Sequence, residues 1–225
     1  MPNTSELKLY SSWINQQEAF ISSLQLQPLV VVLRPTQKDF EKPYSRNPFF
    51  SIFEELSFEG VRHIEIGWSS HPDWASLIKE LKSSFTNISL GAASITSTTG
   101  LKVISELNME YAMTPIWNPK LQLQARNFNQ LLIPGVFSPT EIQQAQLFGC
   151  RLIKLFPAST LGIKYLSNLK QPLGKLPFII ASGGLSVDDI IPWLEEGYGA
   201  IALGRRLLQN DQINSKLKSW LKRHA

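Results

Sequence analysis

A lysine interrupts a segment that is otherwise typical of a buried β-strand. Lys154 lies within Leu152-Ile153-Lys154-Leu155-Phe156. Because side chains alternate along a strand, Leu152, Lys154 and Phe156 share one face. Burial disfavours the charged form of a lysine and lowers its pKa, which makes a neutral, nucleophilic amine available at about pH 7. The alternative is a lysine at the strand end whose amine extends into solvent.

Glu65 interrupts a second apolar strand pattern, where it stands between two isoleucines and shares its face with His63 and Gly67. The segment with Glu65 is the second predicted strand, and the segment with Lys154 is the sixth. In a (β/α)8 barrel each interior layer takes its side chains from alternate strands, so these two groups would meet in one layer. A carboxylate beside an amine can act as general acid and base and can hold the amine in place. The alternative is a plain ion pair.

Two glycine-containing turns follow the last two predicted strands. They read Ser182-Gly183-Gly184 and Gly204-Arg205-Arg206. Glycine lets the backbone approach a ligand closely, and the N-terminus of a following helix directs N–H groups at an anion. The corresponding loops of (β/α)8 barrels commonly bind phosphate. The hydroxyl of Ser182 and the charge of Arg205 or Arg206 would add to such a site.

Metal chemistry is not expected. The histidines are His63, His71 and His224, and the one cysteine is Cys150. These residues lack the spacing of a metal-ligand set, and a single cysteine cannot form an intramolecular disulfide. We therefore expect neither a metal nor another cofactor, and Glu65 is the best candidate for a general base.

Short apolar runs alternate with segments of helical periodicity along the chain. The predicted strands cover residues 29–33, 62–66, 88–92, 110–114, 130–133, 151–155, 177–181 and 199–203. This alternation predicts parallel strands joined by crossovers, since a tight hairpin cannot join parallel strands. An open doubly wound sheet would alternate in the same way, but the strand count and the lack of a G-x-G-x-x-G turn favour a barrel. We expect an α/β fold, a (β/α)8 TIM barrel formed as a single domain by residues 1–225.

Helical patterns separate the strands. One buried stripe consists of Trp74, Leu77, Ile78, Leu81 and Phe85. Ser138-Pro139-Thr140-Glu141 is typical of a capping box with proline at the first helical position. An additional helix over residues 6–24 is expected to close the bottom of the barrel. The last helix would take its apolar side from Leu207, Leu208, Leu217, Trp220 and Leu221.

The composition is that of a globular protein, with 43% hydrophobic and 18% charged residues in 225. No apolar run approaches the ~20 residues of a membrane span, and the N-terminus lacks the features of a signal peptide. We therefore expect a soluble, cytoplasmic protein that binds no membrane. The net charge of +4 suits an anionic substrate. Basic residues near the C-terminus favour a solvated helix face over a nucleic-acid site.

Taken together, these segments resemble the 2-keto-3-deoxy-6-phosphogluconate aldolase family, which includes 2-keto-3-deoxy-6-phosphogalactonate and 4-hydroxy-2-oxoglutarate aldolases. The resemblance spans residues 28–208. It rests on Val32-Leu33-Arg34, Gly60-Val61-Arg62-His63-Ile64-Glu65-Ile66, Gly91-Ala92-Ala93-Ser94, Ile133-Pro134-Gly135-Val136, Ile153-Lys154-Leu155-Phe156-Pro157-Ala158 and Ser182-Gly183-Gly184.

The resemblance implies a homotrimer of barrels that performs metal-free aldol cleavage of a small, phosphorylated 2-keto acid. Lys154 would match the Schiff-base lysine and Glu65 the acid/base glutamate. Arg34 would match an arginine that binds the substrate's carboxylate, and Ser94 a substrate-binding threonine. The remaining positions expected to line the pocket are Pro115, Phe156, Ser182, Gly183, Gly184, Gly204 and Arg205.

Several residues depart from the family pattern at the far end or the rim of the pocket. They are Ala93 and Ser94, Gly67, Ile116, Ser159, Arg205 and Arg206, together with a lengthened segment at 35–50. They leave the identity of the substrate open, whereas Lys154 and Glu65 fit the family.

Three functional hypotheses remain. The first is a class I aldolase in which Lys154 forms an imine with a 2-keto-3-deoxy sugar acid and Glu65 moves protons. The second is a phosphate-binding barrel isomerase or lyase that uses Lys154 only as a charge. The third is a non-catalytic barrel that binds a metabolite.

Overall fold

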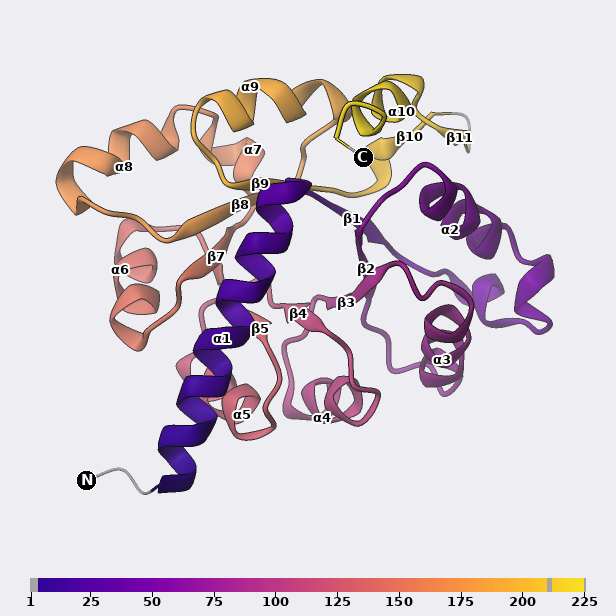
Figure 1. Cartoon of the computed structure of the whole chain (residues 1–225), viewed down its shortest axis with the longest axis horizontal. Coiled ribbons are helices and arrows are strands. Elements are labelled where there is room, and N and C mark those ends of the chain that lie inside the picture. Colours follow the sequence, from indigo (N-terminus) through magenta and orange to yellow (C-terminus); the bar gives the residue numbers. More distant parts are fainter. Residues whose placement is uncertain (1–3, 210–211, 225) are drawn as a thin grey trace.

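Parallel strands close into a barrel in the computed structural model, which describes residues 4–209 and 212–224 (Figure 1). The strands are β1 (Leu29–Leu33), β2 (His63–Gly67), β3 (Ser89–Ala93), β4 (Tyr111–Met113), β5 (Leu132–Ile133), β6 (Gly135–Val136), β7 (Leu152–Leu155), β8 (Phe178–Ser182) and β9 (Ala200–Leu203). Their hydrogen-bonded order is β5-β4-β3-β2-β1-β9-β8-β7-β6. Strands β5 and β6 are two pieces of one barrel strand on either side of Pro134, so the expected (β/α)8 barrel is confirmed.

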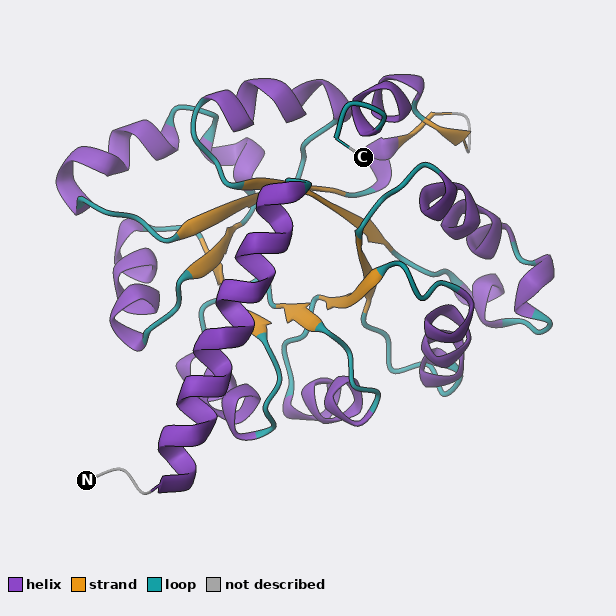
Figure 2. Cartoon of the chain, in the orientation of Figure 1, coloured by secondary structure: helices purple, strands orange, loops and turns teal. Residues whose placement is uncertain are grey.

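Helices surround the barrel as crossovers (Figure 2). They are α2 (Pro48–Phe58), α3 (Trp74–Ser84), α4 (Thr98–Glu106), α5 (Pro119–Asn127), α6 (Pro139–Phe148), α7 (Ala158–Leu161), α8 (Tyr165–Leu173) and α9 (Ile190–Glu195). The capping box predicted before α6 is present, because Ser138 N–H donates to Glu141 Oε2 and Glu141 N–H donates to Ser138 Oγ. The apolar stripe predicted for α3 is buried.

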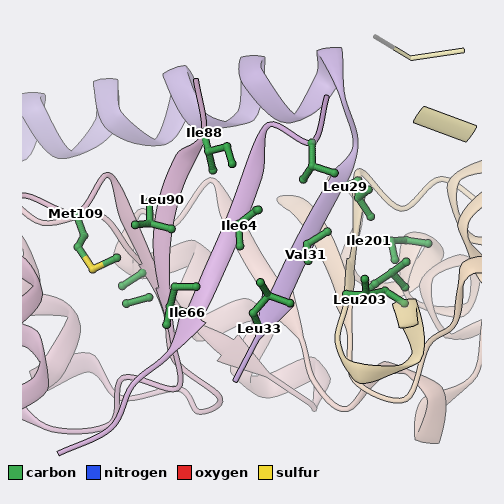
Figure 3. Packing of buried hydrophobic residues seen from close by; sticks show 14 of the residues in the cluster. Leu29, Val31, Leu33, Ile64, Ile66, Ile88, Leu90, Met109, Ile201 and Leu203 are labelled. Carbon is green, nitrogen blue, oxygen red and sulfur yellow. The ribbon is translucent and has the colours of Figure 1, made fainter. Parts of the chain in front are cut away.

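The strands separate two apolar cores, as the alternation of side chains requires. The outer core lies between the strands and the surrounding helices, and Figure 3 shows part of it from β1, β2, β3 and β9. The inner core fills the barrel. It consists of Phe20, Leu24, Val30, Tyr111, Met113, Leu131, Ile133, Leu152, Ile180, Ala200 and Ala202. The barrel is therefore filled by side chains rather than open as a pore.

Helix α1 (Thr4–Leu26) covers the end of the barrel where the strands begin, as the sequence predicts. Phe20 and Leu24 of α1 belong to the inner core. The side chain of Gln17 accepts a hydrogen bond from Arg151 N–H at 2.7 Å, and Gln27 accepts one from Arg62 N–H at 2.8 Å. Apolar contacts and backbone hydrogen bonds thus hold α1 against this end of the barrel.

The lengthened segment after β1 packs onto its own chain. It forms two 3₁₀ turns, η1 (Gln37–Phe40) and η2 (Tyr44–Arg46), before α2 begins. The ring of Phe40 stacks on His71 with centroids 4.1 Å apart, and Gln37 Nε2 lies 3.0 Å from His71 Nε2. Phe40 and Tyr44 are both buried. The segment therefore lies against the loop that follows β2.

The C-terminal segment differs from the prediction of one long helix. Leu207 ends the 3₁₀ turn η4 (Arg205–Leu207), and Leu208 begins β10 (Leu208–Gln209), which pairs with β11 (Gln212–Ile213). The last helix, α10, covers only Ser215–Leu221. The prediction was wrong here because Leu207, whose spacing suits a helix, belongs to a 3₁₀ turn and is buried there.

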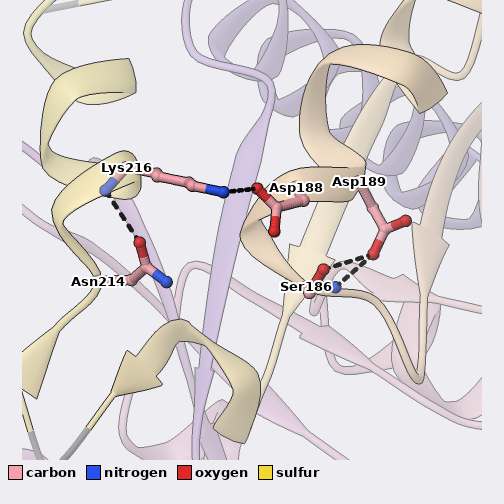
Figure 4. Close-up of polar contacts among 5 residues, drawn as sticks. All are labelled: Ser186, Asp188, Asp189, Asn214 and Lys216. Atoms are coloured by element: carbon pink, nitrogen blue, oxygen red, sulfur yellow. Dashed lines mark hydrogen bonds and ion pairs between the residues drawn. The ribbon is translucent and has the colours of Figure 1, made fainter.

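Two lysines of the basic C-terminal helix pair with carboxylates. Lys216 Nζ lies 2.6 Å from Asp188 (Figure 4), and Lys218 Nζ lies 2.5 Å from Glu55. These contacts agree with a solvated, ion-paired helix face. No helix among the described residues combines the length and the apolar character needed to cross a membrane.

Gly135 of β6 lies at a place in the barrel wall that has no room for a side chain. A Cβ atom at Gly135 would lie 2.3 Å from the carbonyl carbon of Pro115, which belongs to the backbone and cannot rotate away. We expect Gly135→Ala to lower the free energy of unfolding by about 1–3 kcal/mol, as overpacking does elsewhere. Urea denaturation would measure it. Gly204→Ala is the control, since a Cβ at Gly204 would meet nothing within 4 Å; an equal loss in both variants would contradict the steric argument.

Candidate active site

A cavity of about 290 Å³ opens at the end of the barrel where the strands finish. Active sites of this fold lie at that end. The residues lining the cavity are Val32, Arg34, Lys154, Phe156, Ser182, Gly183, Gly184, Leu185, Ala202, Gly204, Arg205 and Arg206. Most of the site residues predicted from the sequence are in this set. Glu65, Ser94 and Pro115 are not.

Lys154 projects from β7 into the barrel and is only 4% exposed. Its Nζ lies 5.1 Å from the centroid of the Phe156 ring. Burial lowers the pKa of Lys154; the carboxylate of Glu65 acts in the opposite direction, and the charge of Arg34 acts with burial. The amine therefore loses its proton more readily than a lysine in water. The predicted alternative, an amine extending into solvent, does not describe this geometry.

Glu65 lies on β2 and is fully buried. Neither carboxylate oxygen has a hydrogen-bond partner within the structure, so Glu65 and Lys154 do not form a direct ion pair. Burial raises the pKa of Glu65 to about 7, against the lowering effect of Lys154 and Arg34. A carboxyl group with this pKa can both take up and release a proton near neutral pH.

Arg34 and Ser94 meet at the side of the site. Arg34 follows β1, and its Nη2 donates a hydrogen bond to Ser94 Oγ at 3.0 Å. A Cβ at Gly67 would lie 3.1 Å from both Cγ and Nη1 of Arg34, so the absence of a side chain at Gly67 gives the arginine its place. The guanidinium lines the cavity and provides a donor pair for a planar anion such as a carboxylate.

The two glycine turns also line the cavity. Gly183 and Gly184 have φ angles of +95° and +78°, which L side chains rarely adopt. A Cβ at Gly183 would also lie 2.9 Å from the Phe156 ring. Arg206 Nη1 donates to Gly184 O at 2.7 Å and so connects the loops after β8 and β9. Arg205 is exposed and lines the rim.

The segment after the first glycine turn is fixed by a capping box. Ser186 N–H and Oγ–H both donate to Asp189 Oδ2, at 2.7 and 2.8 Å (Figure 4). The box leads into the 3₁₀ turn η3 (Val187–Asp189) and α9. The backbone around Gly183 and Gly184 is therefore fixed by Arg206 on the one hand and by the capping box on the other.

The structure differs from the predicted site in two ways: it places a predicted residue outside the cavity lining, and it adds residues that were not predicted. Pro115 lies beside Gly135 in the barrel wall and does not line the cavity. Val32 and Ala202 supply apolar wall that the prediction omitted. Val32 shares a strand face with Val30, and Ala202 shares one with Ala200, so alternation along the strands could have predicted that both residues face the barrel interior. Among the described residues, no three histidine, cysteine, aspartate or glutamate side chains gather where they could hold a metal ion.

Known structures share this fold. The chain is similar to the 2-keto-3-deoxy-6-phosphogluconate aldolase of Zymomonas mobilis ZM4. The match covers 91% of this chain and 94% of that one, with a TM-score of 0.72 at 19% identity. The KDPG aldolase of Legionella pneumophila, captured with pyruvate as a covalent carbinolamine intermediate, has a TM-score of 0.69 at 17% identity over 91% of this chain and 95% of that one.

Sequence relatives point the same way. The chain is 24% identical to the 2-dehydro-3-deoxy-6-phosphogalactonate aldolase of Escherichia coli K12, over 68% of this chain and 75% of that protein. It is 25% identical to the 2-dehydro-3-deoxy-phosphogluconate aldolase of Treponema pallidum, over 60% of this chain and 64% of that protein. The family model for KDPG and KHG aldolase matches residues 23–221. With this match over most of its length, the chain belongs to the KDPG and KHG aldolase family.

Proposed function

We propose that this chain is a class I aldolase that cleaves a phosphorylated 2-keto-3-deoxy sugar acid into pyruvate and an aldehyde. The observation that carries the proposal is the amine of Lys154, which is buried, lines the cavity and lies close enough to the carboxyl group of Glu65 for the two charges to interact. A lysine whose pKa is lowered in an enclosed site is suited to imine formation with a ketone.

The covalent steps follow from these two groups. The neutral amine of Lys154 adds to the C2 ketone, and loss of water from the carbinolamine gives an iminium. The iminium withdraws electrons as the proton leaves the C4 hydroxyl and the C3–C4 bond breaks, which releases the aldehyde and leaves an enamine. Protonation at C3 and hydrolysis release pyruvate and restore the amine. Glu65 moves the protons in these steps, for which a pKa of about 7 is well matched.

The polar residues that line the cavity suggest how the substrate is oriented. Arg34 and Ser94 would bind the carboxylate, since the guanidinium reaches the cavity and is held by the serine hydroxyl. Ser182, Gly183, Gly184, Gly204 and Arg205, which also line the cavity, would bind the phosphate. 2-Keto-3-deoxy-6-phosphogluconate, which yields glyceraldehyde 3-phosphate, fits this orientation, and the relatives' names support a phosphorylated substrate.

The homotrimer implied by the family resemblance is part of the proposal. Ile116 and Phe137 follow β4 and β6, and both remain substantially exposed, at 46% and 43%. In a trimer, contacts between subunits would cover these two side chains.

The imine can be trapped directly. Incubation with pyruvate and borohydride should attach a reduced pyruvate to Lys154, because the reduction converts the imine into a stable secondary amine. Peptide mapping by mass spectrometry would locate the adduct. We expect Lys154→Met to abolish both labelling and turnover, and Lys102→Met, which alters an exposed lysine, to preserve both.

Different results would favour the other hypotheses. Binding of a phosphorylated ligand without any reducible imine would favour an isomerase or lyase that uses Lys154 as a charge. An imine on Lys154 with no pyruvate released from any 2-keto-3-deoxy acid would favour a non-catalytic barrel. An adduct on another lysine would contradict the assignment of Lys154.

The phosphate site makes a separate prediction. In a panel of 2-keto-3-deoxy acids assayed by pyruvate release, we expect phosphorylated substrates to have the higher kcat/KM. Arg205→Ala should raise KM for a phosphorylated substrate about tenfold, the effect of losing one charge-assisted hydrogen bond. KM for the unphosphorylated analogue should not change. Arg223→Ala, at an exposed arginine after α10, is the control, and an equal effect of Arg205→Ala on both substrates would argue against phosphate binding there.

A further inference from the structure

The barrel interior contains a polar side chain that the proposed mechanism does not use. Tyr111 of β4 is completely buried in the inner core, and its hydroxyl has no hydrogen-bond partner within the structure. Buried polar groups are nearly always hydrogen-bonded, so an unpaired one calls for an explanation. The two carboxylate oxygens of Glu65 are unpaired in the same interior. An unpaired donor and an unpaired acceptor thus occur in one small, enclosed space.

The register of the strands directs Tyr111 toward Glu65. Glu65 pairs with Gly91 on β3, and Gly91 pairs with Tyr111 on β4, so the three residues form one row across neighbouring strands. A Cβ at Gly91 would lie 2.4 Å from Cζ of Tyr111, closer than to any other atom of the ring. The hydroxyl-bearing end of the ring therefore lies over Gly91, in the position that a larger residue would fill.

The ring of Tyr111 also has a neighbour on β2. Its ring centroid lies 6.3 Å from the ring of His63, which is two residues before Glu65 on β2, and 4.2 Å from the ring of Phe20. Burial raises the pKa of Tyr111, and the next largest cause is the charge of Glu65. The hydroxyl is thus close enough to Glu65 to respond to its ionisation.

The other ionisable groups around Glu65 do not replace this contact. Lys154 from β7 and Arg34 from the end of β1 act on Glu65 through their charges, without a hydrogen bond. His63, on the same strand as Glu65, has its Nε2 3.0 Å from Ser23 Oγ. Burial lowers the pKa of His63 to about 4, so it is neutral near pH 7. His63 Nδ1 is also unpaired, but the Tyr111 hydroxyl is the neutral group whose residue lies in the same row of the barrel as Glu65.

We propose that Tyr111 is a positioning residue for Glu65: the Tyr111 hydroxyl donates a hydrogen bond to a bridging water molecule, which in turn donates one to the ionised carboxylate of Glu65. The contact fixes the orientation of the carboxylate below the reacting atoms and favours its ionised form. Its role in turnover rests on the proposed function, whereas the contact itself is a property of the protein without substrate.

The contact can be tested in the ligand-free protein. The carboxyl carbon of Glu65 would be followed by NMR during a pH titration of protein labelled with ¹³C-glutamate, with Glu65→Gln used to assign the signal. Tyr111→Phe removes only the hydroxyl. Because that hydroxyl stabilises the ionised carboxylate, its loss should raise the pKa of Glu65 by about one pH unit.

Tyr198→Phe is the matched control. Tyr198 is also a buried tyrosine, but it packs on Trp193 in the outer core, away from the barrel interior. We expect the pKa of Glu65 to be the same in Tyr198→Phe as in the unaltered protein. A pKa of Glu65 that is unchanged or lower in Tyr111→Phe would overturn the proposal.

The pH profile of kcat/KM gives a second readout, since it reports the ionisations of the free enzyme. The limb that belongs to Glu65 should move upward in Tyr111→Phe by the same amount as the NMR titration, and an unmoved limb would overturn the positioning role. Failure of the proposed function would be recognised separately. In that case the unaltered protein would form no imine with pyruvate, and the NMR titration would still decide whether Tyr111 contacts Glu65.

Discussion

Desolvation of Lys154 and Glu65 inside the barrel is the interaction on which the rest of the site depends. Removing an ionised amine or carboxylate from water costs several kcal/mol per group, and proteins commonly respond by shifting the pKa. Here both shifts have burial as their largest cause. A tight ion pair would have opposed them, since it would keep the amine charged. The separation of the two groups therefore matters as much as their proximity.

The fold closes one end of this water-poor barrel interior and leaves the other end open to a ligand. Helix α1 closes the end where the strands begin, and its Phe20 and Leu24 complete the inner core. The cavity at the other end gives a ligand access to Lys154, and Glu65 is buried behind the residues that line the cavity. Glycines admit the side chains that shape the site: Arg34 rests against Gly67, and Tyr111 lies over Gly91. One end of the barrel is thus closed by apolar side chains, and the other end carries the polar residues of the cavity.

Much of the fold could be predicted because it follows from local patterns. The predicted strands agree with the observed ones to within a few residues, and the interruption of apolar runs by Lys154 and Glu65 correctly indicated where polar groups enter the barrel. The division of the fifth strand at Pro134 was not predicted, although proline lacks the N–H that a continuous strand needs. The end of the chain was mispredicted because leucines at helical spacing can equally be buried from a turn and a hairpin.

The arrangement of the site needed the structure. The distance between Glu65 and Lys154 depends on the tilt and stagger of strands far apart in sequence, so no spacing in the chain reveals that the two groups are not hydrogen-bonded. Tyr111 was absent from the prediction because tyrosine is common in strands, and its significance comes only from its register with Gly91 and Glu65. The reason for Gly67 likewise appears only once Arg34 is in place.

The central claim, that burial keeps the amine of Lys154 available as a nucleophile, is tested most directly by titrating that amine. NMR of protein labelled with ¹⁵N-lysine would follow its Nζ signal, assigned with Lys154→Met. We predict a pKa below the usual 10.5, and a still lower pKa in Glu65→Gln, because the carboxylate of Glu65 favours the charged amine. A pKa at or above 10.5, or one that Glu65→Gln leaves unchanged, would contradict the account.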